Sequence, residues 1–276
     1  MSYPENRKST DKGFLPPRMT TAERDAIASP AEGLTIYNTE YNCLQYFKGT
    51  LWFDLCEGGL TPGPESDCPF IPTFLPSDET VVNDVISLTG ETWMDRNLGA
   101  YNAARSSTDC WAYGNIYQWG RGSDGHEHRT SDPLPTSAST AIPNAGNPWD
   151  GKFITPPSSP YDWLNPQNDN LWQGGSGINN PCPAGYRLPT SPEWDSEIGS
   201  WGSLTPAGAY ASPLKLPAAG QRNPYSGLLL VVGTSGYYWS STVDGEFSRS
   251  LLFYSGGANW NNDRRATGES VRCIKD

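Results

Sequence analysis

The chain has 276 residues, enough for one large or two modest domains. Its 19 lysines and arginines against 30 acidic residues give a net charge of −11, which argues against nucleic acid or an anionic membrane surface as a partner. Only 18% of the residues are charged, and no apolar run approaches the ~20 residues that span a bilayer. A disordered polyelectrolyte and a chain inserted in a membrane by an apolar helix are therefore excluded.

Residues 1–56 are expected to form a small β-rich module for attachment or oligomerisation. Thr20, followed three residues later by Glu23, has the capping-box pattern of a short helix. Residues 33–38 predict a strand, and residues 44–55 predict a hairpin. Three short strands bury little surface, so this module is expected to lean on a neighbour or on copies of itself.

Residues 57–79 are rich in proline and glycine and predict a linker, whereas residues 80–276 have the composition of a second domain. Residues 123–149 and 155–183 predict two long loops. The second contains aromatic and leucine residues that should fasten it to a core, which is typical of packed or functional loops. The N-terminus lacks the apolar stretch of a secretory signal, so we expect either that a signal has been cleaved or that the protein leaves the cell by another route, such as within a virus particle. The expected location is accordingly a virion or the extracellular space or cell surface.

Two further elements are expected within residues 80–276. Thr190 precedes Pro192 and several acidic residues, which predicts the start of a short helix. Residues 227–232 form an apolar run of strand length and predict a fully buried strand.

The six cysteines form an even set without zinc-like spacing. Cys43 and Cys56 would face each other across a hairpin turning at Gly49-Thr50. Cys182 and Cys273 would close a long loop within the second domain. Six reduced thiols, which a cytosolic origin would favour, are the alternative.

The C-terminal region combines aromatic, serine, asparagine and glycine residues, which are typical of binding loops because aromatic rings offer contact area at low entropic cost. Read as a strand, residues 247–254 place Phe247 and Arg249 on one face and Ser248 on the other. An ordinary solvated loop of an all-β domain is the alternative interpretation. The candidate ligand-binding residues are Tyr237, Asp244, Glu246, Ser248, Tyr254, Asn259, Trp260, Asn261, Asn262 and Asp263.

Several phrases occur together in one order along residues 80–276. They are Trp93–Leu98, Tyr113–Trp119, Cys182–Thr190 with Glu193–Trp194, Tyr238–Thr242 and Ser270–Lys275. The series resembles the Fibrobacter succinogenes major paralogous domain of Bacteroidetes and their phages, and is similar to the formylglycine-generating-enzyme branch of the C-type lectin fold. The resemblance implies an α+β, C-type lectin-like domain with small twisted antiparallel sheets and long irregular loops, preceded by the small β-rich module. It also implies that Trp239 belongs to the core.

Domains that end in this way resemble the variable proteins of diversity-generating retroelements, which randomise adenine-containing codons in a C-terminal stretch. Residues 13–38 are similar to a module that precedes the tips of Bacteroidetes surface proteins and phage tail fibres. The resemblance implies a non-enzymatic tail-fibre tip that binds a host cell-surface protein or glycan, as a homotrimer held by the N-terminal module. A bacterial cell-surface adhesin with the same domain is the alternative.

An enzyme of the formylglycine-generating type is a third hypothesis, which lacks support because such enzymes need two nearby cysteines and only Cys273 lies near the C-terminus. The calcium-binding phrases of sugar-binding lectins are not present in their expected form at residues 222–224 or 260–263. No cofactor is expected, although a structural calcium ion among loop carboxylates stays open, with ligands that the sequence does not place. Residues 124–128 offer two imidazoles and carboxylates that suit a transition metal, or are solvated side chains.

Overall fold

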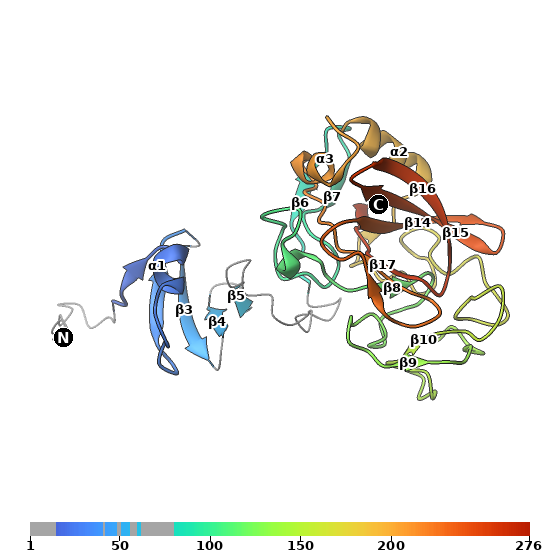
Figure 1. The fold of residues 1–276 in the computed structure, drawn as a ribbon, viewed down its shortest axis with the longest axis horizontal. Coiled ribbons are helices and arrows are strands. Elements are labelled where there is room, and N and C mark those ends of the chain that lie inside the picture. The colour runs from blue at the N-terminus through green and yellow to red at the C-terminus, as the bar shows by residue number, and fades with distance from the viewer. Residues whose placement is uncertain (1–14, 41, 49–50, 56–59, 62–79) are drawn as a thin grey trace. The chain divides into compact units, whose positions relative to one another are not determined.

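The protein is described by a computed structural model over residues 15–40, 42–48, 51–55, 60–61 and 80–276 (Figure 1). The chain divides into two compact units, residues 1–67 and 68–276, which are described separately. Cys56, the Gly49-Thr50 turn and most of the predicted linker lie outside the described residues.

The described residues of unit 1 form one sheet with strand order β1-β2-β3-β4-β5, in which β1 and β2 are parallel and the other pairs antiparallel. The register places Lys48 opposite Leu51, as the predicted hairpin requires. The elements are β1 (Arg18–Met19), α1 (Thr21–Asp25), β2 (Thr35–Asn38), β3 (Cys43–Lys48), β4 (Leu51–Asp54) and β5 (Leu60–Thr61).

The predicted capping box of α1 is confirmed. The Thr20 hydroxyl accepts a hydrogen bond from the Glu23 backbone N–H (3.3 Å), and the Glu23 carboxylate accepts one from the Thr20 N–H (2.8 Å). Beneath the helix, the buried Arg24 donates to Gln45 Oε1 (2.9 Å), which ties α1 to β3. Local sequence therefore determines this helix start, and a long-range bond holds it on the sheet.

Unit 2 contains several small sheets joined by long loops. Their strand orders are β11-β18-β7-β6, β13-β12-β17-β8, β14-β15-β16 and the parallel pair β10-β9. The strands are β6 (Asp84–Ile86), β7 (Thr92–Met94), β8 (Tyr117–Gln118), β9 (Pro133–Leu134), β10 (Phe153–Ile154), β11 (Tyr186–Arg187), β12 (Gln221–Arg222), β13 (Leu229–Leu230), β14 (Gly236–Asp244), β15 (Phe247–Tyr254), β16 (Gly257–Arg264), β17 (Gly268–Glu269) and β18 (Ile274–Lys275), and the helical segments are η3 (Cys110–Ala112), α2 (Ser191–Gly199) and α3 (Pro206–Ala211).

The expected α+β, C-type lectin-like fold is wrong. The described residues are mostly in β-sheets, with 10% helix and 28% strand distributed over several small sheets. The predicted short helix is confirmed as α2, which has Thr190 as its N-cap and spans nine residues. Short helices of this kind depend on packing rather than on their own cooperativity, and the 25 prolines and 29 glycines limit longer ones.

Two hydrophobic clusters form the core of unit 2. Trp93 packs on Trp194 with ring centroids 4.8 Å apart, in the cluster under α2 and α3. Trp239 lies in the other cluster, and its indole Nε1 donates to the Tyr117 carbonyl (2.8 Å). The phrases recognised in the sequence thus meet inside one unit, and the prediction that Trp239 is a core residue is confirmed.

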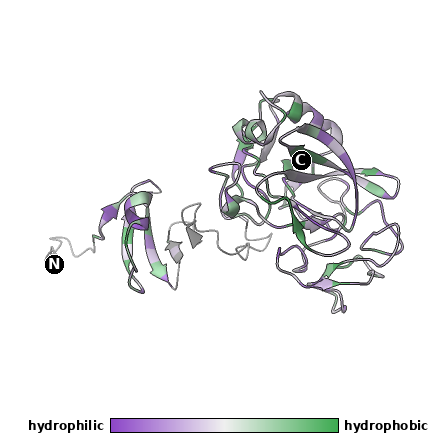
Figure 2. Cartoon of the chain, in the orientation of Figure 1, coloured by the Kyte–Doolittle hydropathy of each residue, from purple (hydrophilic) through white to green (hydrophobic). Residues whose placement is uncertain are grey.

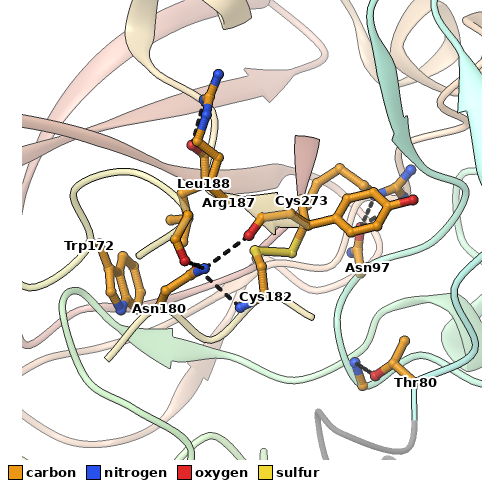
Figure 3. Close-up of a disulfide and its surroundings, with 12 residues drawn as sticks. Thr80, Asn97, Trp172, Asn180, Cys182, Arg187, Leu188 and Cys273 are labelled. Carbon is orange, nitrogen blue, oxygen red and sulfur yellow. Dashed lines mark hydrogen bonds between the residues drawn. A yellow bond between two sulfur atoms is a disulfide. The ribbon is translucent and has the colours of Figure 1, made fainter. Parts of the chain in front are cut away.

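The C-terminal segment is held by a disulfide and by a buried arginine. Cys182 and Cys273 are disulfide-bonded with Cα atoms 5.9 Å apart, so this predicted pair is confirmed (Figure 3). Arg272 is completely buried, and its guanidinium donates to Asn97 Oδ1 (2.8 Å) and the Leu214 carbonyl (2.7 Å). Cys43 is also disulfide-bonded, but its predicted partner, Cys56, lies outside the described residues.

The predicted long loop at residues 155–183 is confirmed, and its Trp163 and Trp172 side chains are buried in the core.

The prediction of a fully buried strand at residues 227–232 is wrong. Only Leu229–Leu230 forms a strand, β13, at the edge of its sheet, and Leu228, Val231 and Val232 are exposed. An apolar run of strand length does not by itself distinguish a central strand from an exposed hairpin.

Candidate ligand-binding face

The candidate residues lie on the antiparallel sheet β14-β15-β16, in which β16 is an edge strand. Cross-strand rows define two faces. The Tyr238 face contains the row Tyr238–Leu251–Trp260, whereas the Trp239 face contains the row Trp239–Ser250–Asn261. Near β14 both faces are covered, because Tyr238 and Trp239 belong to the two separate core clusters.

The edge strand β16 consists mainly of hydrophilic residues (Figure 2). Its side chains alternate between the two faces, so the candidates do not share one surface. Asp244, Trp260 and Asn262 belong to the Tyr238 face and Glu246 to the β14–β15 turn, and the Trp239 face carries Tyr237, Ser248, Tyr254, Asn259, Asn261 and Asp263.

On the Tyr238 face, Trp260 is tied to its surroundings. Its indole Nε1 donates to Asp195 of α2 (2.6 Å), and the Arg249 guanidinium lies 4.6 Å from the centroid of its ring. Asn262 is exposed, and its amide donates to Asp244 Oδ2 (2.7 Å). The structure therefore brings Asp244 and Asn262 together, and it places Trp260 partly within the fold.

On the Trp239 face, Tyr254 and Asn259 are exposed, and neither side chain has a hydrogen bond or ring contact with the described residues. They lie near each other, because Asn259 pairs with Leu252, two residues from Tyr254 on the same face. Ser248, by contrast, is completely buried. The most exposed part of this face is therefore the end that carries Tyr254 and Asn259, whereas Tyr237, Asn261 and Asp263 are partly buried.

A buried carboxyl group lies beneath the Trp239 face. Asp263 Oδ2 accepts hydrogen bonds from the Ser250 hydroxyl (3.0 Å) and the Asn261 amide (2.8 Å). Glu269 of β17 is completely buried and lies next to Asp263 and Ser250. Burial, together with the nearby Asp263 carboxylate, raises the pKa of Glu269 well above 4.5. Burial and the same two acids raise the pKa of Tyr237 to about 12.

Glu269 should make the protein less stable as the pH rises. The folded state retains its proton, whereas the unfolded chain releases it near the ordinary pKa of 4.5. Its contribution is therefore complete below that pKa and is lost as the pH rises towards the folded-state pKa. We expect Glu269→Gln to reduce the loss of unfolding free energy between about pH 5 and about pH 8, measured by urea unfolding. Equal losses in both proteins would contradict this assignment.

Sequence reasoning missed an arginine and aromatic ladder beside the candidate residues. The Arg264 guanidinium lies 4.6 Å from the Tyr161 ring centroid and 5.4 Å from that of Phe247, and the Tyr161 ring meets Tyr225 at 4.7 Å. The alternation of strand residues predicted which face Phe247 occupies. Nothing in the local sequence indicated that Tyr161, from a distant loop, would pack against Arg264 next to it.

Residues 124–128 form a hydrogen-bonded cluster. One ligand atom from each of Asp124, His126 and Glu127 lies within 4.8 Å of the others, and His128 does not belong to this group. His126 Nε2 accepts from the Gln118 N–H (3.3 Å), so Nδ1 carries the proton and donates to Asp124 Oδ1 (2.8 Å). Burial lowers the pKa of His126. Both ring nitrogens thus have protein partners, and a metal ion would have to displace one of them.

The two units define a modular, β-rich protein with a hydrophilic edge strand on its second unit. None of the helices in the described part of the chain has the length and apolar character that crossing a membrane requires. Residues 4–67, in the first unit, match the family model of a phage tail like trimerisation region. This match indicates a phage tail fibre-type protein and fits a homotrimer on a virion tail. No curated protein and no solved structure matches the chain.

Proposed function

We propose that this protein is a non-enzymatic receptor-binding protein of a phage tail fibre. Residues 4–67 would hold three copies together, and unit 2 would bind a protein or glycan on the host surface through β16 and the adjoining strand ends. The match to a phage tail like trimerisation region supports the tail-fibre context. Participation of Cys273 in a disulfide argues against a role as a catalytic thiol.

The observation that carries the binding proposal is that the residues holding the fold together are different from the exposed residues of the sheet. Trp239, Arg272 and the disulfide secure β14 and the C-terminus, whereas Tyr254 and Asn259 project from the sheet without side-chain partners among the described residues. Side chains of this kind can change without loss of a core contact. Variation by a diversity-generating retroelement is part of this proposal, and a near-copy of the 3′ end of the gene that differs mainly at adenines would support it.

Tyr254→Ala with Asn259→Ala tests the proposed face. Both side chains are exposed, so the double variant should retain the melting temperature of the parent within about 2 °C. It should lose binding by about tenfold or more, because exposed aromatic and amide groups are typical of recognition surfaces. The measurement is binding of the labelled full chain to a panel of Bacteroidetes cells, among which the parent chain first identifies a bound strain.

Ile86→Ala with Leu88→Ala is the matched control, because it removes two exposed side chains at the edge of another sheet. The control should bind cells like the parent. Equal binding by the double variant and the control would contradict the proposed face. A large fall in the melting temperature would mean that Tyr254 and Asn259 support the fold instead.

A further inference from the structure

The β12–β13 hairpin displays an apolar surface that the proposed binding face does not use. Leu228 is 64% exposed, Val231 46% and Val232 41%, and they lie within five consecutive residues. Tyr225 and Leu230 are exposed as well. Single exposed apolar residues are ordinary, but a contiguous group of this size is typical of a contact surface.

The hairpin is held firmly in this exposed position. At its base, Arg222 is buried, and its Nε donates to the Gly227 carbonyl (2.7 Å) while its Nη1 donates to the Ser131 hydroxyl (2.7 Å). The Gly233 N–H donates to the Ala218 carbonyl (2.8 Å) on the returning side. The apolar side chains are thus presented on a fixed backbone, which reduces the entropic cost of binding.

Val231 lies in an unfavourable backbone conformation directly after β13. Its φ of 50° is in the left-handed region, which β-branched residues rarely occupy. Its carbonyl accepts hydrogen bonds from the Thr234 hydroxyl (2.9 Å) and from the Ser235 N–H (3.1 Å), which hold that conformation. A strained residue that the surrounding bonds maintain is common at contact sites.

The sheet also leaves one side of β13 unpaired among the described strands, since β13 pairs only with β12 at the edge of its sheet. An exposed apolar edge strand promotes association with another chain. Leu229 therefore adds an outward-facing backbone N–H and carbonyl to the apolar surface.

Charge and the first unit together indicate the partner. Each chain has a net charge of −11, so two copies repel each other wherever their acidic surfaces approach. Residues 223–243 contain no charged residue, so two copies can meet there without bringing like charges together. Residues 4–67 match a trimerisation region. A trimer held by these residues would keep the second units of neighbouring copies at high effective concentration.

We propose that the β12–β13 hairpin, residues 221–234, packs against the same hairpin of neighbouring copies in the trimer. This contact would be a second site of association, separate from residues 4–67 and from the receptor-binding face. Leu228, Leu230, Val231 and Val232 would be removed from water there. The hairpins of the three copies would meet around the threefold axis, through apolar surface rather than ion pairs.

Val232→Cys in the full chain tests this contact, with Leu204→Cys as the matched control because Leu204 is 46% exposed in a different part of unit 2. We expect V232C to form disulfide-linked dimers under mild oxidation on a non-reducing gel, and L204C to stay uncrosslinked. The new thiol of V232C should react with N-ethylmaleimide about tenfold or more slowly than that of L204C, because reaction requires local opening. Leu228→Cys replaces V232C if that variant does not fold.

Sedimentation of the parent chain completes the test. A trimer in which the V232C thiol reacts as fast as the control and does not crosslink would overturn the proposal, as would a monomeric parent. Loss of cell binding by V232C with a freely reactive thiol would show that the hairpin contacts the receptor, which also contradicts it. The crosslinking, thiol-reactivity and sedimentation outcomes do not depend on the Tyr254 and Asn259 face.

Discussion

Replacing Trp239 by alanine should lower the free energy of unfolding by about 3–5 kcal/mol, because it removes the largest side chain type from a completely buried position. The indole also donates a hydrogen bond to the carbonyl of Tyr117 in β8 (2.8 Å), and the substitution would leave that carbonyl without this partner. The measurement is urea unfolding of the full chain, followed by near-ultraviolet circular dichroism to report on unit 2.

Trp260→Ala is the appropriate control, since it removes the same side chain from the edge strand of the same sheet. Trp260 is only partly buried, so its loss should cost about 1–2 kcal/mol through the contacts with Asp195 and Arg249. The sequence placed Trp260 among the candidate binding residues, and its bond to Asp195 of α2 is the reason to expect a contribution to stability. Equal costs for the two variants would contradict the distinction between core and edge.

Removing the Cys182–Cys273 disulfide should be the other large change. The bond joins residues 91 positions apart, and closing a loop of that length stabilises the folded state by about 4–5 kcal/mol through the entropy of the unfolded chain. Cys182→Ala with Cys273→Ala should therefore unfold at a clearly lower urea concentration. Alanine is preferable to serine, because Cys273 is completely buried and an unpaired hydroxyl there would add its own cost.

The single variant Cys182→Ala separates loop closure from packing. It breaks the same bond but keeps the Cys273 side chain in the core, so most of the loss should already be present in it. If both variants kept the midpoint of the parent, the disulfide would have no role in stability. A loss confined to the double variant would assign the effect to packing around Cys273 instead.

Features governed by neighbouring residues were predictable. The capping box at Thr20 and the helix start at Thr190 depend on bonds over three residues, and both are confirmed. The pairing of Lys48 with Leu51 follows from the geometry of a hairpin with a two-residue connection. The Cys182–Cys273 pair, one of the two pairs named from the sequence, is confirmed as well.

The fold class and the position of the apolar run were not predictable in this way. The resemblance led to an α+β, lectin-like expectation, whereas the structure consists mainly of small sheets. Residues 227–232 have the composition of a buried strand, yet Arg222 and the Gly233 backbone hold them at the surface. The composition of a segment indicates that its side chains are apolar. It does not indicate whether they are buried within the same chain or remain at the surface for contact with another molecule.

For the candidate binding residues, the primary structure alone established the β15 alternation, since successive strand residues point to opposite sides. The assembled fold settled which of those sides is accessible: it buried Ser248, fastened Trp260 to α2 and left Tyr254 and Asn259 exposed. Local order follows from short-range sterics and hydrogen bonds, which the residue pattern records. Exposure depends on contacts between segments far apart in the chain, and these form only when the core around Trp239 and Trp194 assembles.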